Sequence, residues 1–195
     1  MLALNRIIAL LALSALPAGA ESQGPLKTAE LSARVYDAGL AEGDPLILLT
    51  AAQLRQEAGL SPDLPLSAEA ILTQAEAMAG DDPALLALID DIRAQKAKGV
   101  ASGPIYHIAA LPAAATESRP PIPFRGGEYA EVYVEAAPGA NLTLTVLDES
   151  GHVVCTDGDH SHIAYCGWTP AKDGAFTLTI ENAGSGPTDY ALMTN

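Results

Sequence analysis

The sequence is poor in cysteine, in aromatic residues and in positive charge. Of 195 residues two are cysteine and 5% are aromatic, and 10 Lys and Arg stand against 24 Asp and Glu, a net charge of −14. Nucleic acids and anionic membrane surfaces repel a polyanion, so neither is an expected partner. If the two cysteines pair, no thiol is left over as a reactive nucleophile.

Catalytic and nucleotide-binding motifs are also missing. The sequence has no G-x-S-x-G turn, no H-E-x-x-H zinc motif and no P-loop. His107 stands apart from any nucleophile or orienting carboxylate that the sequence can place beside it. We therefore expect a non-enzymatic protein without a catalytic cofactor.

Long apolar runs are confined to the N-terminus, where residues 1–20 read as a signal peptide. Arg6 is followed by the apolar run 7–13 (IIALLAL) and by an A-x-A cleavage site ending at Ala20. This run is too short to span a bilayer by itself. We expect cleavage near Ala20 and a periplasmic or secreted bacterial protein that makes no membrane contact afterwards.

Residues 21–98 predict a helical-hairpin domain. Apolar residues recur at helical spacing from Thr28, after a flexible stretch 21–27. Asp44, Ser67 and Asp82 precede the next three helices as N-caps. A shift of 38 residues places Asp44-Pro45 on Asp82-Pro83, which indicates two tandem helical hairpins. Two hairpins are few for a solenoid, so we expect this domain to need support from the second domain or from another chain.

Residues 99–121 predict a linker, because Gly, Pro and Ala dominate there. Within it, residues 105–109 (IYHIA) are also compatible with a first strand of the next domain.

From Phe124 onward apolar and polar residues alternate with a period of two. The runs 129–136, 142–147 and 176–181 each show this pattern, and Gly, Pro, Asn and Asp lie between them. Such a pattern is typical of an antiparallel sheet with one face toward water. The fold class is therefore α+β: tandem helical hairpins, then an antiparallel β-sandwich of jelly-roll type over residues 122–195.

The last 72 residues resemble a known bacterial family. A Cys-x-Asp-x-Asp segment (155–159) is followed by a second cysteine (Cys166), a Gly-x-Phe strand (174–176) and a closing Tyr190. This order of motifs is similar to that of the pre-peptidase C-terminal (PPC) β-sandwich domains. The resemblance implies a non-catalytic accessory domain of an exported protein. In some relatives loop carboxylates bind calcium or the domain contacts polymeric substrates. The helical half resembles no family that its residues identify.

Residues 152–168 concentrate the chemistry of the chain. They hold Cys155 and Cys166, three of the four histidines and the only tryptophan. In an exported protein two cysteines predict a disulfide. The alternative is a zinc site of the two cysteines with His160 and His162, whose spacing fits no standard finger.

An acidic loop, defined here as Asp157–Asp159, is the candidate metal site. Asp157 and Asp159 could both bind calcium, with Asp148, Glu149 and Asp173 as helpers at distant sequence positions. The alternative is a turn in which these side chains accept backbone hydrogen bonds. A further set of aromatic residues could form a ligand platform or pack in the core. These residues are Tyr129, Tyr133, Tyr165 and Trp168.

Two functions follow from this reading. The first is a binding protein whose helical half contacts another envelope or secreted protein while the sandwich serves as an accessory module. The second is a calcium- or carbohydrate-binding sandwich with the helices as a spacer.

Overall fold

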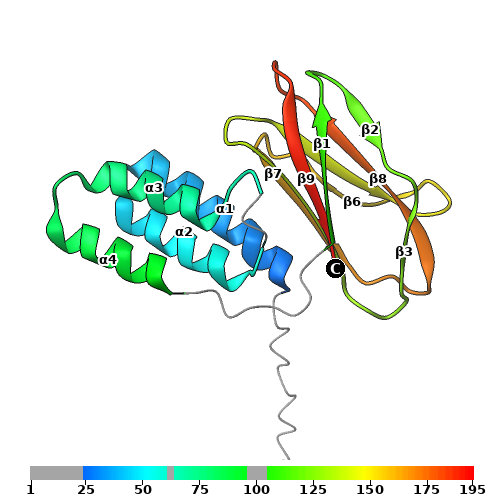
Figure 1. The fold of residues 1–195 in the computed structure, drawn as a ribbon. Helices are drawn as coiled ribbons and strands as arrows, with labels where there is room; N and C mark the ends of the chain where they lie inside the picture. Colours follow the sequence, from blue (N-terminus) through cyan, green and yellow to red (C-terminus); the bar gives the residue numbers. More distant parts are fainter. Residues whose placement is uncertain (1–23, 61–63, 96–104) are drawn as a thin grey trace, which may run out of the picture.

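The computed structural model describes residues 24–60, 64–95 and 105–195, and in these it contains four helices followed by nine strands. The fold is α+β as predicted, with a helical half (24–95) beside a β-sandwich (105–195) (Figure 1). The predicted signal peptide lies outside the described residues. None of the described helices is both long and apolar enough to span a bilayer.

The helices are α1 (Pro25–Glu42), α2 (Pro45–Glu57), α3 (Ala68–Ala79) and α4 (Pro83–Ala94). The predicted caps of the last three are confirmed: the side chains of Asp44, Ser67 and Asp82 accept backbone N–H groups of the first helical turn. The first helix begins three residues earlier than predicted. Pro25 occupies its first position, where proline is favoured because that N–H has no helical partner anyway.

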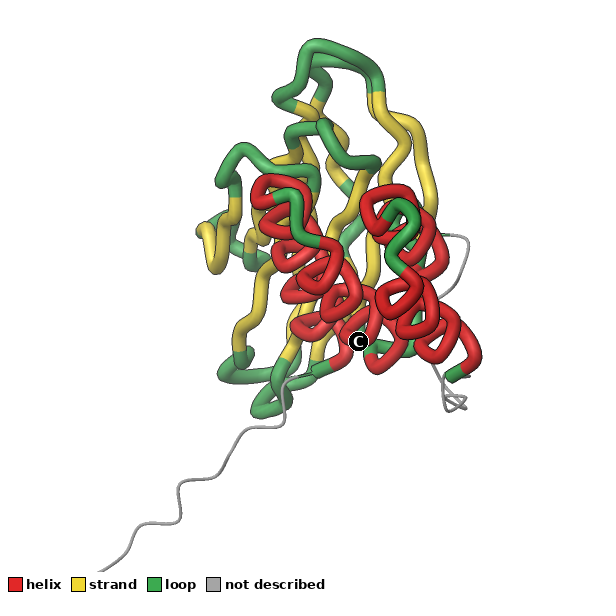
Figure 2. Tube along the Cα trace, turned by 90° about the vertical axis from the view of Figure 1, so that its left-hand side faces the viewer, coloured by secondary structure: helices red, strands yellow, loops and turns green. Residues whose placement is uncertain are grey.

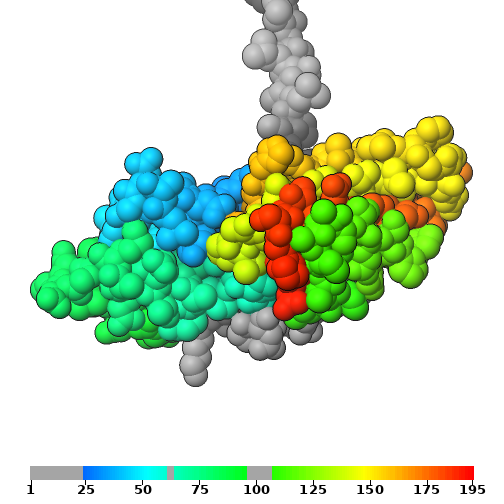
Figure 3. Space-filling model, turned by 90° about the horizontal axis from the view of Figure 1, so that it is seen from above, coloured from blue at the N-terminus to red at the C-terminus, as the bar shows by residue number. Residues whose placement is uncertain are grey.

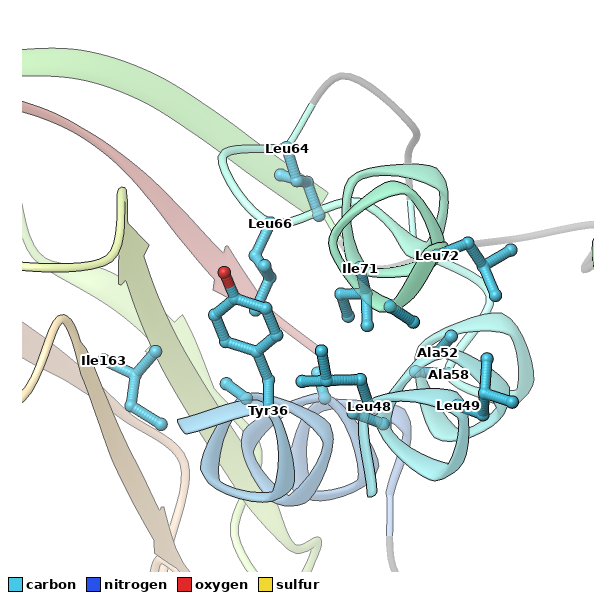
Figure 4. Packing of buried hydrophobic residues seen from close by; sticks show 14 of the residues in the cluster. Tyr36, Leu48, Leu49, Ala52, Ala58, Leu64, Leu66, Ile71, Leu72 and Ile163 are labelled. Carbon is cyan, nitrogen blue, oxygen red and sulfur yellow. The ribbon is translucent and has the colours of Figure 1, made fainter. Parts of the chain in front are cut away.

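Consecutive helices pack against one another as two antiparallel hairpins (Figure 2). Leu48 of α2 points toward α1, and Ile71 of α3 lies near it in the same hydrophobic cluster (Figure 4). The outermost helix, α4, contributes only Ile89 and Ile92 as buried residues. Burial therefore decreases from the helices nearest the sandwich toward α4.

Two antiparallel sheets form the sandwich. The strands are β1 (Ile105–Leu111), β2 (Thr116–Ser118), β3 (Ile122–Phe124), β4 (Ala130–Ala136), β5 (Leu142–Leu147), β6 (Val153–Asp157), β7 (Ile163–Trp168), β8 (Gly174–Asn182) and β9 (Thr188–Thr194). One sheet has the order β1-β9-β4-β7 and the other β2-β8-β5-β6, with β3 also paired to β8. The predicted inward residues Leu142, Leu144 and Val146 are fully buried between the sheets.

The predicted linker 99–121 has to be corrected. Residues 105–111 form β1, paired with the last strand β9, and residues 116–118 form β2, paired with β8. The run 105–109 is therefore the start of the sandwich. Gly and Pro marked the turns around these short edge strands, and the Ala-rich turn between them concealed the strand pattern.

The two halves pack together over a broad face (Figure 3). Tyr133, Ile163, Ala191 and Met193, from β4, β7 and β9, belong to the same hydrophobic cluster as the helix residues. In consequence β4 is buried on both faces. The expectation that its polar face, Glu131 to Glu135, meets water is wrong, because the helical half covers that face.

Candidate binding site

A cleft of about 280 Å³ opens at one end of the sandwich. Its walls are the turn between β5 and β6, the start of β6, the end of β7 and the loop that leads into β8. The residues used below are Asp148, Glu149, Val154, Trp168, Lys172, Asp173 and Phe176. This "Trp168 cleft" combines an indole, aliphatic carbon and charged groups, which is the usual composition of a small binding site.

The carboxylates in the wall of the Trp168 cleft are held by backbone N–H groups of neighbouring loops. Glu149 accepts from Ala175 N (3.1 Å), Asp173 accepts from Gly126 N (2.8 Å), and Asp148 accepts from Ser150 N (2.8 Å). Each bond ties one loop to the next or closes a turn, so the cleft is formed before any ligand arrives.

Gly126 is required for this arrangement. A Cβ at this position would stand 2.4 Å from Cα of Lys172, so only glycine lets the β3–β4 turn approach the loop before β8. The N–H of Gly127 donates to the carbonyl of Pro170 in the same contact (2.8 Å).

An aromatic cluster lies under the Trp168 cleft. The ring of Trp168 is 5.0 Å from that of Phe124 and 5.3 Å from that of Phe176, in tilted and edge-on arrangements that favour aromatic pairs. The indole Nε1 is buried and has no hydrogen-bond partner in the part of the chain that the structure describes.

The predicted disulfide is confirmed and lies directly behind the Trp168 cleft. Cys155 and Cys166 are bonded (S–S 2.07 Å). Cys155 lies in β6 and Cys166 in β7, which are the terminal strands of the two different sheets. The bond therefore joins the two sheets at their open edge. Both cysteines are close in sequence to cleft residues: Cys155 follows Val154 directly, and Cys166 is two residues before Trp168.

The structure also shows where the four possible zinc ligands lie. Both sulfurs are used in the disulfide. His160 is exposed beside Asn141, whereas His162 is buried beneath the helices. The four residues thus do not form one site in the structure.

The acidic loop contacts a cation that the helical half supplies. Arg34 of α1 donates to Asp159 (Nη1–Oδ2 2.6 Å), and its Nη2 lies 3.7 Å from Asp157 Oδ2. Asp157 also accepts the N–H of Tyr165 (2.9 Å). Although burial opposes it, the hydrogen bond from Arg34 lowers the pKa of Asp159.

The other carboxylates considered for calcium lie elsewhere. Asp148, Glu149 and Asp173 line the Trp168 cleft, next to the opposite end of β6, about 15 Å away along the strand. Across residues 24–60, 64–95 and 105–195, no group of three or more His, Cys, Asp or Glu side chains could hold a metal ion. In the structure Asp157 and Asp159 contact α1 through Arg34.

A buried polar network joins the two halves. Glu135 of β4 and Arg55 of α2 form an ion pair at 2.7 Å with side chains 0% and 2% exposed. Glu135 also accepts the hydroxyl of Tyr133 (2.6 Å) and the N–H of Leu66 (2.9 Å). Burial opposes the charge of Arg55, but the charge of Glu135 raises its pKa overall.

Sequence reasoning missed this network. Arg55 lies on the same buried face of α2 as Leu48, Ala51 and Ala52, and that position is the local signal that could have indicated a buried partner. The strand pattern of β4 gave no indication, because a buried and a solvent-exposed Glu alternate with apolar residues in the same way.

A third polar contact between the halves is a buried histidine. His162 is 3% exposed, and its Nδ1 lies 3.6 Å from Asp37 Oδ2 of α1. Burial lowers the pKa of His162, against the attraction of Asp37 and Glu135. Burial likewise raises the pKa of Asp37, against the attraction of His162 and Arg34.

The four candidate platform aromatics are not brought together. Tyr133 is buried under the helices, and Trp168 lines its cleft. Tyr129 and Tyr165 meet through their hydroxyls (3.2 Å), and Tyr165 also donates to the buried carboxylate of Glu131 (2.8 Å). The four aromatic residues thus lie at three separate positions: under the helices, in the Trp168 cleft, and at the contact between Tyr129 and Tyr165.

No known protein-family model matches the chain, and no curated protein matches its sequence. Among solved structures, the sandwich matches the pre-peptidase C-terminal domain of a collagenase from Bacillus anthracis, with 14% identity and a TM-score of 0.38, over 47% of this chain and 89% of that one. This is the family that the C-terminal residues resemble in sequence. The helical half has no recognised family.

A second match is the Yersinia pseudotuberculosis-derived mitogen, with 15% identity and a TM-score of 0.35, over 48% of this chain and 85% of that one. A third is Aeromonas hydrophila PliG, a periplasmic inhibitor of g-type lysozyme, with 10% identity and a TM-score of 0.34, over 47% of this chain and 86% of that one. At these identities and scores the matches say nothing about what this chain binds.

Proposed function

We propose that the chain is an exported, non-enzymatic binding protein that recognises another envelope or secreted protein through the outer surface of its helical half. In this proposal the sandwich is the accessory module on which the helices are mounted. The disulfide supports an oxidising compartment, as expected after export.

The observation that carries the proposal is the surface of α4. Its Leu88 is 41% exposed, and Leu85 and Leu86 are only half-buried. The inner helices bury their apolar faces against each other and against the sandwich, whereas among the described residues α4 packs mainly against α3 and α2. Leu85 and Leu88 lie three residues apart and so share one side of α4, and an exposed apolar patch of this kind can mark an interaction surface.

The charge around α4 indicates the chemistry of that partner. Exposed aspartates lie at both ends of the helix, at positions 81, 82, 90 and 91. Together with the net charge of −14, they favour a partner that presents an apolar residue within a basic surface.

The test is a crosslinking pull-down with the mature protein from envelope and secreted fractions of the source cells. Leu88→Glu keeps helix propensity but places a charge at the centre of the surface, and Ile108→Glu, on β1, is a control of similar exposure (46%). We expect one specific protein to be captured by the unmodified chain and by Ile108→Glu, and to be lost with Leu88→Glu. Equal capture by both variants, or no specific capture, would contradict the proposal.

The other function predicted from the sequence places a ligand on the sandwich. For calcium, the acidic loop already holds the guanidinium of Arg34. For a sugar, the Trp168 cleft is the place that the geometry offers, and its ligand is considered next.

A further inference from the structure

The Trp168 cleft has a negative charge balance. Three carboxylates, those of Asp148, Glu149 and Asp173, stand against the single ammonium of Lys172 in its walls. The whole chain adds to this field with its net charge of −14. An anionic ligand is therefore repelled, and a cationic one is attracted.

Two of these carboxylates have one oxygen available to accept a hydrogen bond from a ligand. Glu149 uses Oε1 for Ala175 N and Asp173 uses Oδ1 for Gly126 N, and within the described residues their second oxygens accept no hydrogen bond. Because the first oxygen fixes each side chain, the second is presented without a further loss of side-chain freedom. Fixed, charged acceptors bind an N–H donor that carries positive charge more strongly than a neutral donor.

The cleft also offers apolar surface. Trp168, Phe176 and Val154 line it beside the carboxylates, and Val154 is 38% exposed. A volume of about 280 Å³ is small for a peptide or a sugar chain but fits a single long side chain. Lysine and arginine are the side chains that combine a long apolar stem with a charged head.

From these observations we infer that the Trp168 cleft binds one basic side chain of a protein partner, an arginine or a lysine, with its stem against Trp168 and its head between Glu149 and Asp173. The site lies on the sandwich, apart from the α4 surface, and does not depend on it.

The only tryptophan of the chain lies in this cleft, so its fluorescence reports on the site directly. We would titrate the mature protein with the peptide acetyl-Gly-Arg-Gly-amide and with its citrulline counterpart, a neutral analogue of nearly the same shape. We expect a saturable change of emission with the arginine peptide and at least about tenfold weaker binding of the citrulline peptide, because a charge-assisted hydrogen bond is lost. Equal binding of the two peptides would overturn the inference.

The variant Glu149→Gln/Asp173→Asn removes two charges but keeps the oxygens that accept from Ala175 and Gly126. We expect it to weaken the arginine peptide about tenfold or more, while Asp81→Asn/Asp91→Asn, an equal change of net charge on exposed positions at α4, leaves it unchanged. Unchanged binding by the cleft variant would refute the site.

A neutral oligosaccharide, cellohexaose, tests the other class of ligand. If cellohexaose changes the emission and the arginine peptide does not, the cleft is a sugar site and the inference is wrong. Leu88→Glu should bind the peptide normally, so a failure here and a failure of the α4 surface can be told apart.

Discussion

Replacement of Glu135 by Gln should separate the stabilities of the two halves. Glu135 accepts from Arg55, from the hydroxyl of Tyr133 and from the N–H of Leu66, and its side chain is 0% exposed. Glutamine keeps an oxygen for Leu66 but leaves the buried guanidinium without a counter-charge. Removal of one partner from a buried ion pair costs about 3–5 kcal/mol, and the retained hydrogen bond places the expected cost near the lower end.

A double-mutant cycle isolates the ion pair from the packing around it. Arg55 already has two buried nitrogens, Nε and Nη2, without partners among the described residues, so it is a costly group once its charge is unpaired. Arg55→Met fills a similar volume without charge. We expect Arg55→Met/Glu135→Gln to be destabilised by at least about 1.5 kcal/mol less than the sum of the two single variants.

The assay is urea unfolding followed by two signals. Circular dichroism at 222 nm reports mainly on the helices, and Trp168 fluorescence reports on the sandwich alone. The transitions should coincide in the unmodified protein and separate in Glu135→Gln, with the helical half unfolding first. A loss below about 1 kcal/mol, or additive single and double variants, would refute the view that this pair couples the halves.

Three further predictions concern the sandwich and its contact with α1. Reduction of the Cys155–Cys166 disulfide, or replacement of both cysteines by Ala, should lower the free energy of unfolding by about 2–4 kcal/mol. The fluorescence of Trp168 should also shift, because the disulfide no longer holds the two strands beside the cleft. An unchanged spectrum would show that the disulfide does not support the cleft. Burial lowers the folded pKa of His162, so the unfolded state takes up its proton first and stability should fall as pH drops below the unfolded value of about 6.5. The raised pKa of Asp37 acts in the opposite sense, because the folded state binds that proton first. His162→Gln should flatten the slope of melting temperature between pH 7 and 5, and an unaltered slope would assign it to other groups. Millimolar calcium should leave the melting temperature unchanged relative to chelator, because Arg34 supplies the cation of the acidic loop, and a rise on calcium addition would show that the loop is a metal site.

Much of the fold follows from local patterns in the sequence. The Asp-Pro pairs at 44–45 and 82–83 begin helices because a side-chain acceptor and a proline without N–H suit the first turn. The alternation in 142–147 gives a strand with one face in the core. Two cysteines in a chain that is expected to be exported are enough to predict their bond. These signals act over a few residues, so they can be read without knowing the fold.

The binding site was only partly predictable. Trp168 stands in the segment that its composition marks as unusual, and Asp148, Glu149 and Asp173 were recognisable as acidic turn residues. Their assembly into one cleft depends on the meeting of three loops, which hydrogen bonds between distant residues such as Gly126 and Asp173 bring about.

The sequence by itself determined the helices, the strands with clear alternation such as β4, β5 and β8, and the disulfide, but not β2, which lies in the predicted linker. Only the tertiary structure decided where water is excluded. The residues Glu131, Tyr133 and Glu135 have the pattern of a solvated strand face, yet all three are buried because the helical half lies on that sheet. Whether a side chain on a strand is exposed depends on what packs against the sheet from far away in the sequence, and for β4 this is Arg55 and its helix, 80 residues earlier.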